Sequence, residues 1–276
     1  MQYLDARGAH IPVLGLGTWT LRGRDCVRLV EQAVRLGYRH FDTAQMYGNE
    51  AEVGRAIKDS GVPRGEFFVV TKVDPGNVSK ARFLPSVMGS LAALDGEIDL
   101  LLIHWPPESS MLDEVIDRLA DARASGQAKA IGVSNFSPGM MRRAHERSGR
   151  AIINNQVEFH PLIDQRAVAA EAKRLGMALS AFSPLARGAA LKPEPIQSIA
   201  RRIGRAPSEV VLRWITQQDV IAIPMTTKRQ NAQSNLSSLD FELTSGDMAE
   251  IGAIGTRQGR LINPSWMAGR WDEELK

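Results

Sequence analysis

Short runs of apolar and β-branched residues recur along the chain, separated by longer segments in which apolar residues return at helical spacing. Eight runs have the length of a strand: residues 13–17, 38–42, 67–72, 98–104, 128–134, 153–159, 178–183 and 220–224. They are apolar without strict alternation, which is typical of strands that are covered on both faces, as in a parallel sheet. The pattern therefore predicts buried parallel strands alternating with helices.

Four of the longer segments carry a clear helical stripe: residues 24–36, 112–124, 165–175 and 208–215. The stripe of the first segment consists of Cys26, Val27, Val30, Ala33 and Val34. Three glycines stand where a left-handed cap would end a helix: Gly37, Gly126 and Gly176. Ser137 before Pro138, and Ser208 after Pro207, are placed to cap the starts of two more helices.

No linker rich in Pro, Gly or Ser separates these elements. They predict one closed (β/α)8 barrel, a TIM barrel, as a single domain over residues 1–276. The alternative is an open doubly wound sheet, whose dinucleotide fingerprint G-x-G-x-x-G would follow the first strand. Gly15 and Gly17 begin such a motif, but Thr20 stands at the position of the third glycine. The barrel is therefore favoured.

The composition is that of an ordinary globular protein, with 43% hydrophobic and 24% charged residues over 276 positions. The single cysteine, Cys26, excludes an internal disulfide framework and a thiolate metal cluster, and it suits a reducing cytosol. The net charge is +3 and the basic residues are scattered as pairs, whereas nucleic-acid binders gather such charge in a patch. We therefore expect no nucleic-acid partner.

The apolar runs are far shorter than the roughly 18 residues of a membrane span. Asp5, Arg7 and His10 interrupt the N-terminal stretch where a signal peptide would need apolar residues. The sequence accordingly predicts a cytoplasmic protein that does not associate with membranes.

Polar side chains stand at the ends of three consecutive predicted strands, where a barrel gathers its catalytic groups. They are Asp42, Lys72 and His104, and Tyr47 follows Asp42 in the next loop. Each has an ordinary explanation by itself: a helix cap, an exposed strand end, a packed core histidine and a surface aromatic. Their joint placement favours a functional site.

The four residue types suit the reduction of a carbonyl group, which needs a proton donor as charge develops on the oxygen. A tyrosine has an ordinary pKa of about 10. The ammonium of Lys72 is expected to lower the pKa of Tyr47, with Asp42 holding Lys72 in place. His104, taken as neutral, would orient the carbonyl oxygen through a hydrogen bond.

Seven stretches match one known family in order and over essentially the whole chain. They are residues 15–19 (GLGTW), 41–50 (FDTAQMYGNE), 71–72 (TK), 102–106 (LIHWP), 131–136 (IGVSNF), 155–158 (NQVE) and 183–185 (SPL). The chain thereby resembles the aldo-keto reductases. The resemblance implies a (β/α)8 barrel that binds NAD(P)H in extended form and reduces small carbonyl compounds. Relatives are often monomers, and we expect a monomer here.

The family's catalytic tetrad matches Asp42, Tyr47, Lys72 and His104, with Tyr47 as general acid. By the same resemblance Ser134, Asn135 and Gln156 hold the nicotinamide carboxamide. Phe182 stands in place of a tyrosine that stacks on the nicotinamide, and stacking needs only the aromatic face. Further cofactor contacts are implied at Gly17, Thr18, Trp19, Ser183, Leu185, Ile223, Thr226, Lys228, Arg229 and Asn235.

The loop after the last strand bears on the choice of cofactor. Met225 and Asn231 replace a lysine and an arginine that grip the 2′-phosphate of NADPH in many relatives. Lys228 and Arg229 remain close by, at a helix start that could hold a phosphate or simply be solvated. This loop resembles that of bacterial 2,5-diketo-D-gluconate reductases of the B type, which also reduce methylglyoxal. NADPH is therefore the expected cofactor, with NADH as the alternative.

The expected substrate pocket contains Trp19, Trp105 and Asn135 beside the tetrad, an apolar wall with few polar groups. The loop after His104 is short, which predicts an open pocket for α-dicarbonyls, simple aldehydes and keto-sugars. One alternative is a redox sensor that binds the cofactor without useful turnover, although such a sensor need not retain all four tetrad residues. Another is a metal-dependent barrel hydrolase or lyase, but no cluster of metal ligands is evident and we expect no metal.

Overall fold

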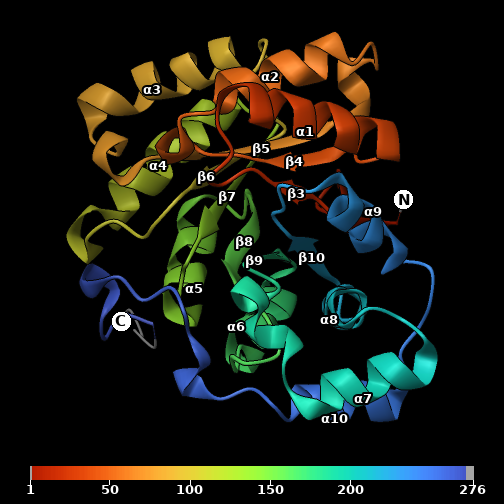
Figure 1. Cartoon of the computed structure of the whole chain (residues 1–276). Helices are drawn as coiled ribbons and strands as arrows, with labels where there is room; N and C mark the ends of the chain where they lie inside the picture. Colours follow the sequence, from red (N-terminus) through yellow and green to blue (C-terminus); the bar gives the residue numbers. More distant parts are fainter. Residues whose placement is uncertain (1, 272–276) are drawn as a thin grey trace.

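Residues 2–271, the part of the chain that the computed structural model describes, form a barrel of parallel strands wrapped by helices (Figure 1). The barrel strands are β3 (Leu16–Gly17), β4 (His40–Asp42), β5 (Phe68–Val73), β6 (Leu100–Ile103), β7 (Ala130–Ser134), β8 (Ile152–Glu158), β9 (Ala178–Phe182) and β10 (Val220–Ile223). Each pairs in parallel with the next, and bridges from Leu14 to Ala222 and from Gly17 to Met225 join the first strand to the last. The predicted (β/α)8 barrel is confirmed.

The helices form the outer layer of the barrel. They are α1 (Gly23–Leu36), α2 (Glu50–Asp59), α3 (Lys80–Ala93), α4 (Leu112–Ala124), α5 (Pro138–Arg147), α6 (Arg166–Leu175), α7 (Glu194–Ile203), α8 (Pro207–Thr216), α9 (Arg229–Ser237) and α10 (Ser245–Gly252). Gly37 and Gly176 are left-handed caps, and the Ser137 hydroxyl caps α5 by accepting from Met140 N, as predicted. In α1, Leu29 is buried, whereas Val27 of the predicted stripe is only half-buried.

The prediction that Ser208 caps a helix is wrong. Helix α8 begins one residue earlier, at Pro207, so Ala206 occupies the cap position and Ser208 already lies inside the first turn. The backbone N–H of Ala206 donates to the Glu209 carboxylate at 3.3 Å. The reciprocal side-chain cap is therefore supplied by Glu209 rather than by a serine.

Strand alternation divides the apolar residues into two cores. Leu100 and Leu102 of β6 point into the barrel, whereas Leu101 and Ile103 pack against the helices. The same period places Phe68 and Val70 of β5 inside the barrel, and the next inward position is Lys72. The apolar filling thus gives way to polar groups at the C-terminal end of the strands.

A hairpin that the sequence analysis did not predict precedes the barrel. It consists of β1 (Tyr3–Ala6) and β2 (Ala9–Pro12), and Ala6 and Ile11 join the apolar core inside the barrel. Arg7 and Gly8 form its two-residue turn with φ values of 48° and 89°, as a type I′ turn requires. A glycine between two short alternating runs was the signal for this turn.

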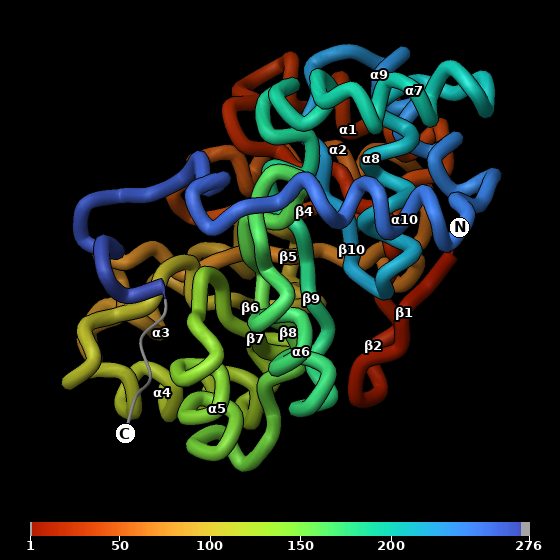
Figure 2. Tube along the Cα trace, turned by 90° about the horizontal axis from the view of Figure 1, so that it is seen from below, coloured from red at the N-terminus to blue at the C-terminus, as the bar shows by residue number. Residues whose placement is uncertain are grey.

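The C-terminal segment, residues 256–271, has no long helix. It leaves α10 and runs along the molecule toward α4 and α5, two helices that come much earlier in the sequence (Figures 1 and 2). It therefore reaches the loops at the C-terminal end of the barrel.

Candidate active site

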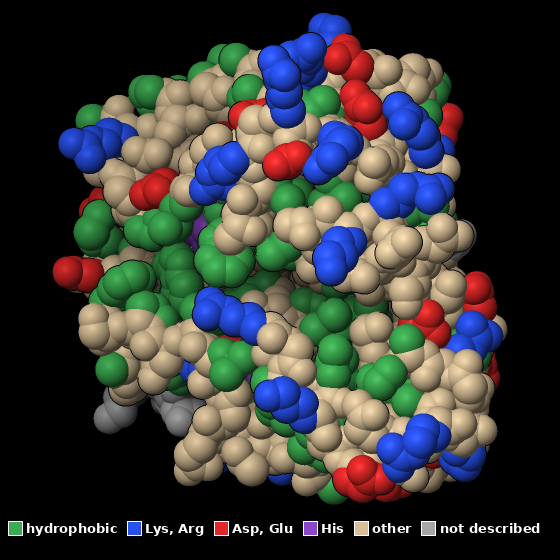
Figure 3. Space-filling view, viewed as in Figure 1, with side chains coloured by type: hydrophobic (Ala, Val, Ile, Leu, Met, Phe, Trp, Pro, Cys, Tyr) green, Lys and Arg blue, Asp and Glu red, His purple; other side chains and the backbone are tan. Residues whose placement is uncertain are grey.

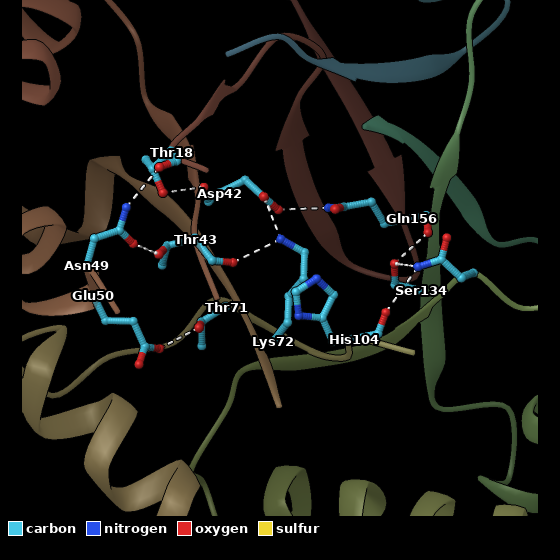
Figure 4. Close-up of polar contacts among 11 residues, drawn as sticks. Thr18, Asp42, Thr43, Asn49, Glu50, Thr71, Lys72, His104, Ser134 and Gln156 are labelled. Carbon is cyan, nitrogen blue, oxygen red and sulfur yellow. Dashed lines mark hydrogen bonds and ion pairs between the residues drawn. The ribbon is translucent and has the colours of Figure 1, made fainter. Parts of the chain in front are cut away.

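A buried ion pair forms the centre of the predicted catalytic site. Lys72 Nζ lies 2.5 Å from Asp42 Oδ1, and both side chains are almost fully buried. The same ammonium donates to the carbonyl oxygen of Thr43 at 2.9 Å, and Gln156 Nε2 donates to Asp42 Oδ2 at 2.7 Å. Figure 4 shows the ammonium pointing at the carboxylate between β4 and β5. Both Asp42 oxygens are thus engaged, which compensates for part of the cost of burying charge.

Tyr47 and His104 complete the group that the sequence predicted. Tyr47 closes a 3-10 helix, η1 (Gln45–Tyr47), and the Lys72 ammonium lies 5.0 Å from the centre of its ring. The His104 ring lies edge-on to Tyr47, with centroids 5.6 Å apart. Residues from three adjacent strands and one loop therefore meet in one small volume.

The surroundings determine the protonation of these groups. Burial would lower the pKa of Lys72, but the charges of Asp42 and Tyr47 and the hydrogen bonds with them together outweigh it and raise that pKa, which favours the ammonium. Burial and the Lys72 charge hold the pKa of His104 well below its ordinary value, which agrees with a neutral imidazole. Burial raises the pKa of Tyr47, and Lys72 offsets this only in part. Lys72 thus lowers the Tyr47 pKa, as expected, but the sequence analysis did not include burial, which raises that pKa by more.

Asn49 was not identified as a site residue from the sequence. Its buried amide donates to the carbonyl oxygens of Thr18 and Leu21 at 2.8 and 3.1 Å, and it accepts from Thr43 Oγ1 at 2.7 Å (Figure 4). Thr18 in turn donates its hydroxyl to the Asp42 carbonyl oxygen at 2.9 Å. Asn49 therefore ties the loop after β3 to the loop after β4 and supports Asp42.

The three residues expected to hold the carboxamide lie close together: Ser134 ends β7, Asn135 follows it, and Gln156 lies on β8. Ser134 Oγ donates to the Gln156 carbonyl oxygen at 2.7 Å, and Asn135 Nδ2 donates to the carbonyl oxygen of His104 at 3.1 Å. Asn135 Oδ1 is buried and has no hydrogen-bond partner among the described residues. An amide N–H₂ group of a cofactor would satisfy this acceptor, so the residues present fit a nicotinamide.

The other expected cofactor residues follow the rim of the barrel, because β7, β8, β9, β10 and β3 are neighbours in that order. Gly17 ends β3, the half-buried Phe182 ends β9, and Ser183 and Leu185 follow it. The side chain of Ile223 lies in the apolar core inside the barrel instead. The expected cofactor residues therefore lie on neighbouring strands of the barrel.

The expected phosphate site lies at the start of α9. Lys228 and Arg229 are exposed, and neither forms an ion pair within residues 2–271. Thr226 Oγ1 accepts from the backbone N–H of Lys228 at 3.1 Å and orders this turn. Asn235 is buried with an unpartnered amide nitrogen in the described chain. Two free cations beside a helix start fit an anionic group.

Aromatic side chains line the predicted substrate pocket. Trp19 is 46% exposed, and the Arg187 guanidinium lies 5.4 Å from its ring centre. Trp105 packs edge-on against Trp266 and Trp271 of the C-terminal segment, with centroids 6.1 and 6.2 Å apart. Figure 3 shows hydrophobic side chains gathered in a hollow in which a histidine is visible. Neither C-terminal tryptophan was expected in this pocket from the sequence.

Residues 13–256 match the family model described as "Aldo/keto reductase family". The chain belongs to this family. Methylglyoxal reductase DkgB of Escherichia coli O157:H7 is 39% identical over 95% of this chain and 99% of its own length, and that of Yersinia pestis is 40% identical over the same shares. A solved structure provisionally assigned as a 2,5-diketo-D-gluconic acid reductase B has a TM-score of 0.95 at 40% identity, covering 99% of this chain and 98% of its own.

Another solved relative is a Gox0644 mutant in complex with NADPH. It has a TM-score of 0.89 at 32% identity and covers 95% of this chain and 96% of its own. These likenesses support the use of a nicotinamide cofactor. The protein is an NAD(P)H-dependent oxidoreductase of the carbonyl-reducing type.

The opposite end of this aldo/keto reductase also carries a cleft, of about 590 Å³, under the β1–β2 hairpin. Its basic groups are largely engaged: Arg39 pairs with Glu66, and Lys129 lies 3.0 Å from Asp99.

Among residues 2–271, no group of three or more His, Cys, Asp or Glu side chains is placed to hold a metal ion. No helix in that stretch is long and apolar enough to cross a membrane.

Proposed function

We propose that this aldo/keto reductase reduces small aldehydes and ketones to alcohols with NADPH, with Tyr47 as the proton donor. The observation that carries the proposal is the arrangement of Tyr47 between a buried ammonium and a neutral imidazole. The Lys72 ammonium lies 5.0 Å and the His104 ring 5.6 Å from the Tyr47 ring. A carbonyl oxygen near this phenol would meet one acid and one neutral hydrogen-bond donor.

The reaction needs a hydride, which the nicotinamide cofactor supplies when bound. The chain's own residues manage the proton and the developing negative charge. Tyr47 gives its hydroxyl proton to the carbonyl oxygen, and the adjacent Lys72 ammonium stabilises the phenolate that remains. Asp42 keeps Lys72 in place, and neutral His104 orients the carbonyl oxygen through a hydrogen bond. Since burial keeps the pKa of Tyr47 above its ordinary value, the donor form persists at neutral pH.

NADPH is proposed over NADH because two cations without ion-pair partners in the described chain flank the expected 2′-phosphate position. Lys228 and Arg229 can take up a phosphate together with the backbone N–H groups at the start of α9. The NADPH-bound Gox0644 relative supports the same choice. Because Met225 and Asn231 replace the usual lysine and arginine, the phosphate contacts fall to the neighbouring Lys228 and Arg229.

The substrate class follows from the pocket and from the named relatives. We take Trp19, Trp105 and the tetrad to line one pocket with an apolar wall and few polar groups, which would suit small carbonyl compounds. The DkgB relatives are named methylglyoxal reductases, and the solved relative carries a diketogluconate name. We therefore propose α-dicarbonyls, simple aldehydes and keto-sugars as substrates.

The test is oxidation of NADPH with methylglyoxal by wild type and by Tyr47→Phe. Loss of the general acid should lower kcat by about 100- to 10,000-fold while NADPH still binds. Tyr3→Phe is a matched control, because that exposed tyrosine stacks on His10 in the hairpin, and it should retain full turnover. Full activity in Tyr47→Phe would overturn the acid role. NADPH binding without turnover of any carbonyl by wild type would favour a sensor.

A further inference from the structure

A fully buried carboxylate two residues beyond Gln156 lies outside the mechanism above. Glu158 ends β8, and its Oε1 and Oε2 accept from the backbone N–H groups of Leu261 and Ile262 at 2.7 and 2.9 Å. His160 Nε2 lies 2.9 Å from Oε1, and the Glu158 and His160 side chains have no exposed surface. One carboxylate therefore engages two consecutive amides of the C-terminal segment.

The chain just before these amides runs against the loop that follows β8. Thr256 N donates to the Leu162 carbonyl oxygen at 3.1 Å, and Asp164 N donates to the Thr256 carbonyl oxygen at 3.0 Å. A Cβ atom at Gly259 would lie 1.7 Å from the Leu162 oxygen, so only glycine fits. The C-terminal segment is thus held in a defined path up to Ile262.

Beyond Ile262 the segment forms part of the substrate pocket. Trp271 Nε1 donates to Asn263 Oδ1 at 2.8 Å, and the Arg260 guanidinium lies 3.6 Å from the Trp271 ring centre. Trp266 and Trp271 both contact Trp105, the residue after His104. Trp266 and Trp271 form one wall of the pocket, and the position of this wall therefore depends on where Glu158 holds the chain.

Strand β8 connects this anchor to the catalytic ion pair. Gln156 and Glu158 are two residues apart and so point to the same face of the strand. The Gln156 amide reaches Asp42, and the Glu158 carboxylate reaches the C-terminal segment. Burial alone would raise the pKa of Glu158, but the hydrogen bonds from His160 and the two amides outweigh it and lower that pKa.

We infer that Glu158 is a positioning residue for the substrate, because its carboxylate fixes the C-terminal segment and thereby sets Trp266 and Trp271 against Trp105. The inference rests on the proposed function only in taking this pocket as the carbonyl site. Glu158 then affects the KM of the substrate rather than the rate of the chemical step. Carbonyl compounds large enough to reach the tryptophans depend on it most.

The first measurement compares wild type with Glu158→Gln, which keeps the shape but turns one acceptor into a donor facing a backbone N–H. We expect KM for phenylglyoxal to rise about tenfold, the typical effect of losing a hydrogen bond to a charged group. KM for methylglyoxal should change less, and kcat and the Kd of NADPH should stay within about threefold. Asp247→Asn is the matched control: Asp247 is a buried carboxylate that caps α10 and pairs with Arg202.

A mutant cycle that combines Glu158→Gln with Trp266→Ala and Trp271→Ala tests whether Glu158 affects KM through the two tryptophans. If Glu158 acts through this wall, Glu158→Gln should add little to the KM of the double tryptophan variant. Gly259→Ala, which displaces the segment without touching Glu158, should give the same KM pattern. Equal losses in kcat and NADPH affinity with an unchanged KM ratio would overturn the inference in favour of general destabilisation.

Limited trypsin digestion separates this inference from the proposed function, because it needs no turnover. Cleavage after Arg257 and Arg260 should be faster in Glu158→Gln than in wild type or Asp247→Asn. If wild type is inactive but the cleavage rates still differ, the proposed substrates are wrong, whereas the contact of Glu158 with the C-terminal segment stands. Equal cleavage rates in all three proteins would overturn the anchor even in an active enzyme.

Discussion

The side-chain amide of Gln156 on β8 donates a 2.7 Å hydrogen bond to Asp42 on β4, across the interior of the barrel. The two residues are 114 positions apart in the chain. Asp42 also receives Lys72 on its other oxygen. The residues expected to hold the cofactor and those expected to transfer the proton therefore share one carboxylate.

Replacing Gln156 by Met should leave Asp42 Oδ2 buried without a donor. Such an unsatisfied acceptor costs about 1–3 kcal/mol, so the free energy of unfolding should fall by that amount. Urea denaturation measures it. Gln218→Met is the comparison. The exposed Gln218 amide donates to the Trp214 carbonyl oxygen at the end of α8, so its loss should change the free energy of unfolding by less than about 0.5 kcal/mol.

Lys72→Met should be more damaging, because it leaves the Asp42 carboxylate buried without its cation. Breaking a buried pair costs about 3–5 kcal/mol, and turnover should be lost as well. Adding Asp42→Asn should restore part of the stability but none of the activity. Denaturation of the single and double variants gives the coupling, and purely additive losses would contradict a direct interaction.

The neutral state of His104 has a consequence for pH dependence. Its pKa is lowered in the folded protein, so the unfolded chain takes up a proton below about pH 6.5 while the folded imidazole stays neutral. This group therefore contributes stability that is present above pH 6.5 and is lost as the pH falls toward the folded pKa. Histidine NMR, with His104→Gln for assignment, should show no His104 titration between pH 6 and 8. A midpoint near 6.5 would contradict a neutral donor.

Removing the cations at the start of α9 should change cofactor choice rather than catalysis. Lys228→Ala and Arg229→Ala should each raise the Kd of NADPH on the order of tenfold and leave that of NADH unchanged. Calorimetric titration with both cofactors measures this. Arg201→Ala, on an exposed arginine paired with Glu194, controls for the loss of one positive charge. Equal effects on NADPH and NADH would place the phosphate elsewhere.

The barrel and the tetrad could be predicted because their signals are local. An apolar run of strand length followed by Asp42, Lys72 or His104 marks a strand end, and parallel strands bring such ends to one rim. Strand bounds differ by up to three residues, since main-chain pairing rather than side-chain type decides where a strand stops. The β1–β2 hairpin was missed because Asp5 and His10 interrupt the apolar run that marks each barrel strand.

The sequence by itself determined which side chains can do chemistry, because strand period and residue type are written into consecutive positions. Only the tertiary structure decided how their environment acts on them. The net rise in the Tyr47 pKa depends on burial by distant elements, and no local pattern encodes that. The contact between Glu158 and Leu261 joins positions 103 residues apart through a backbone N–H that every residue except proline has. Such a contact leaves no mark in the sequence and exists only once the chain has folded.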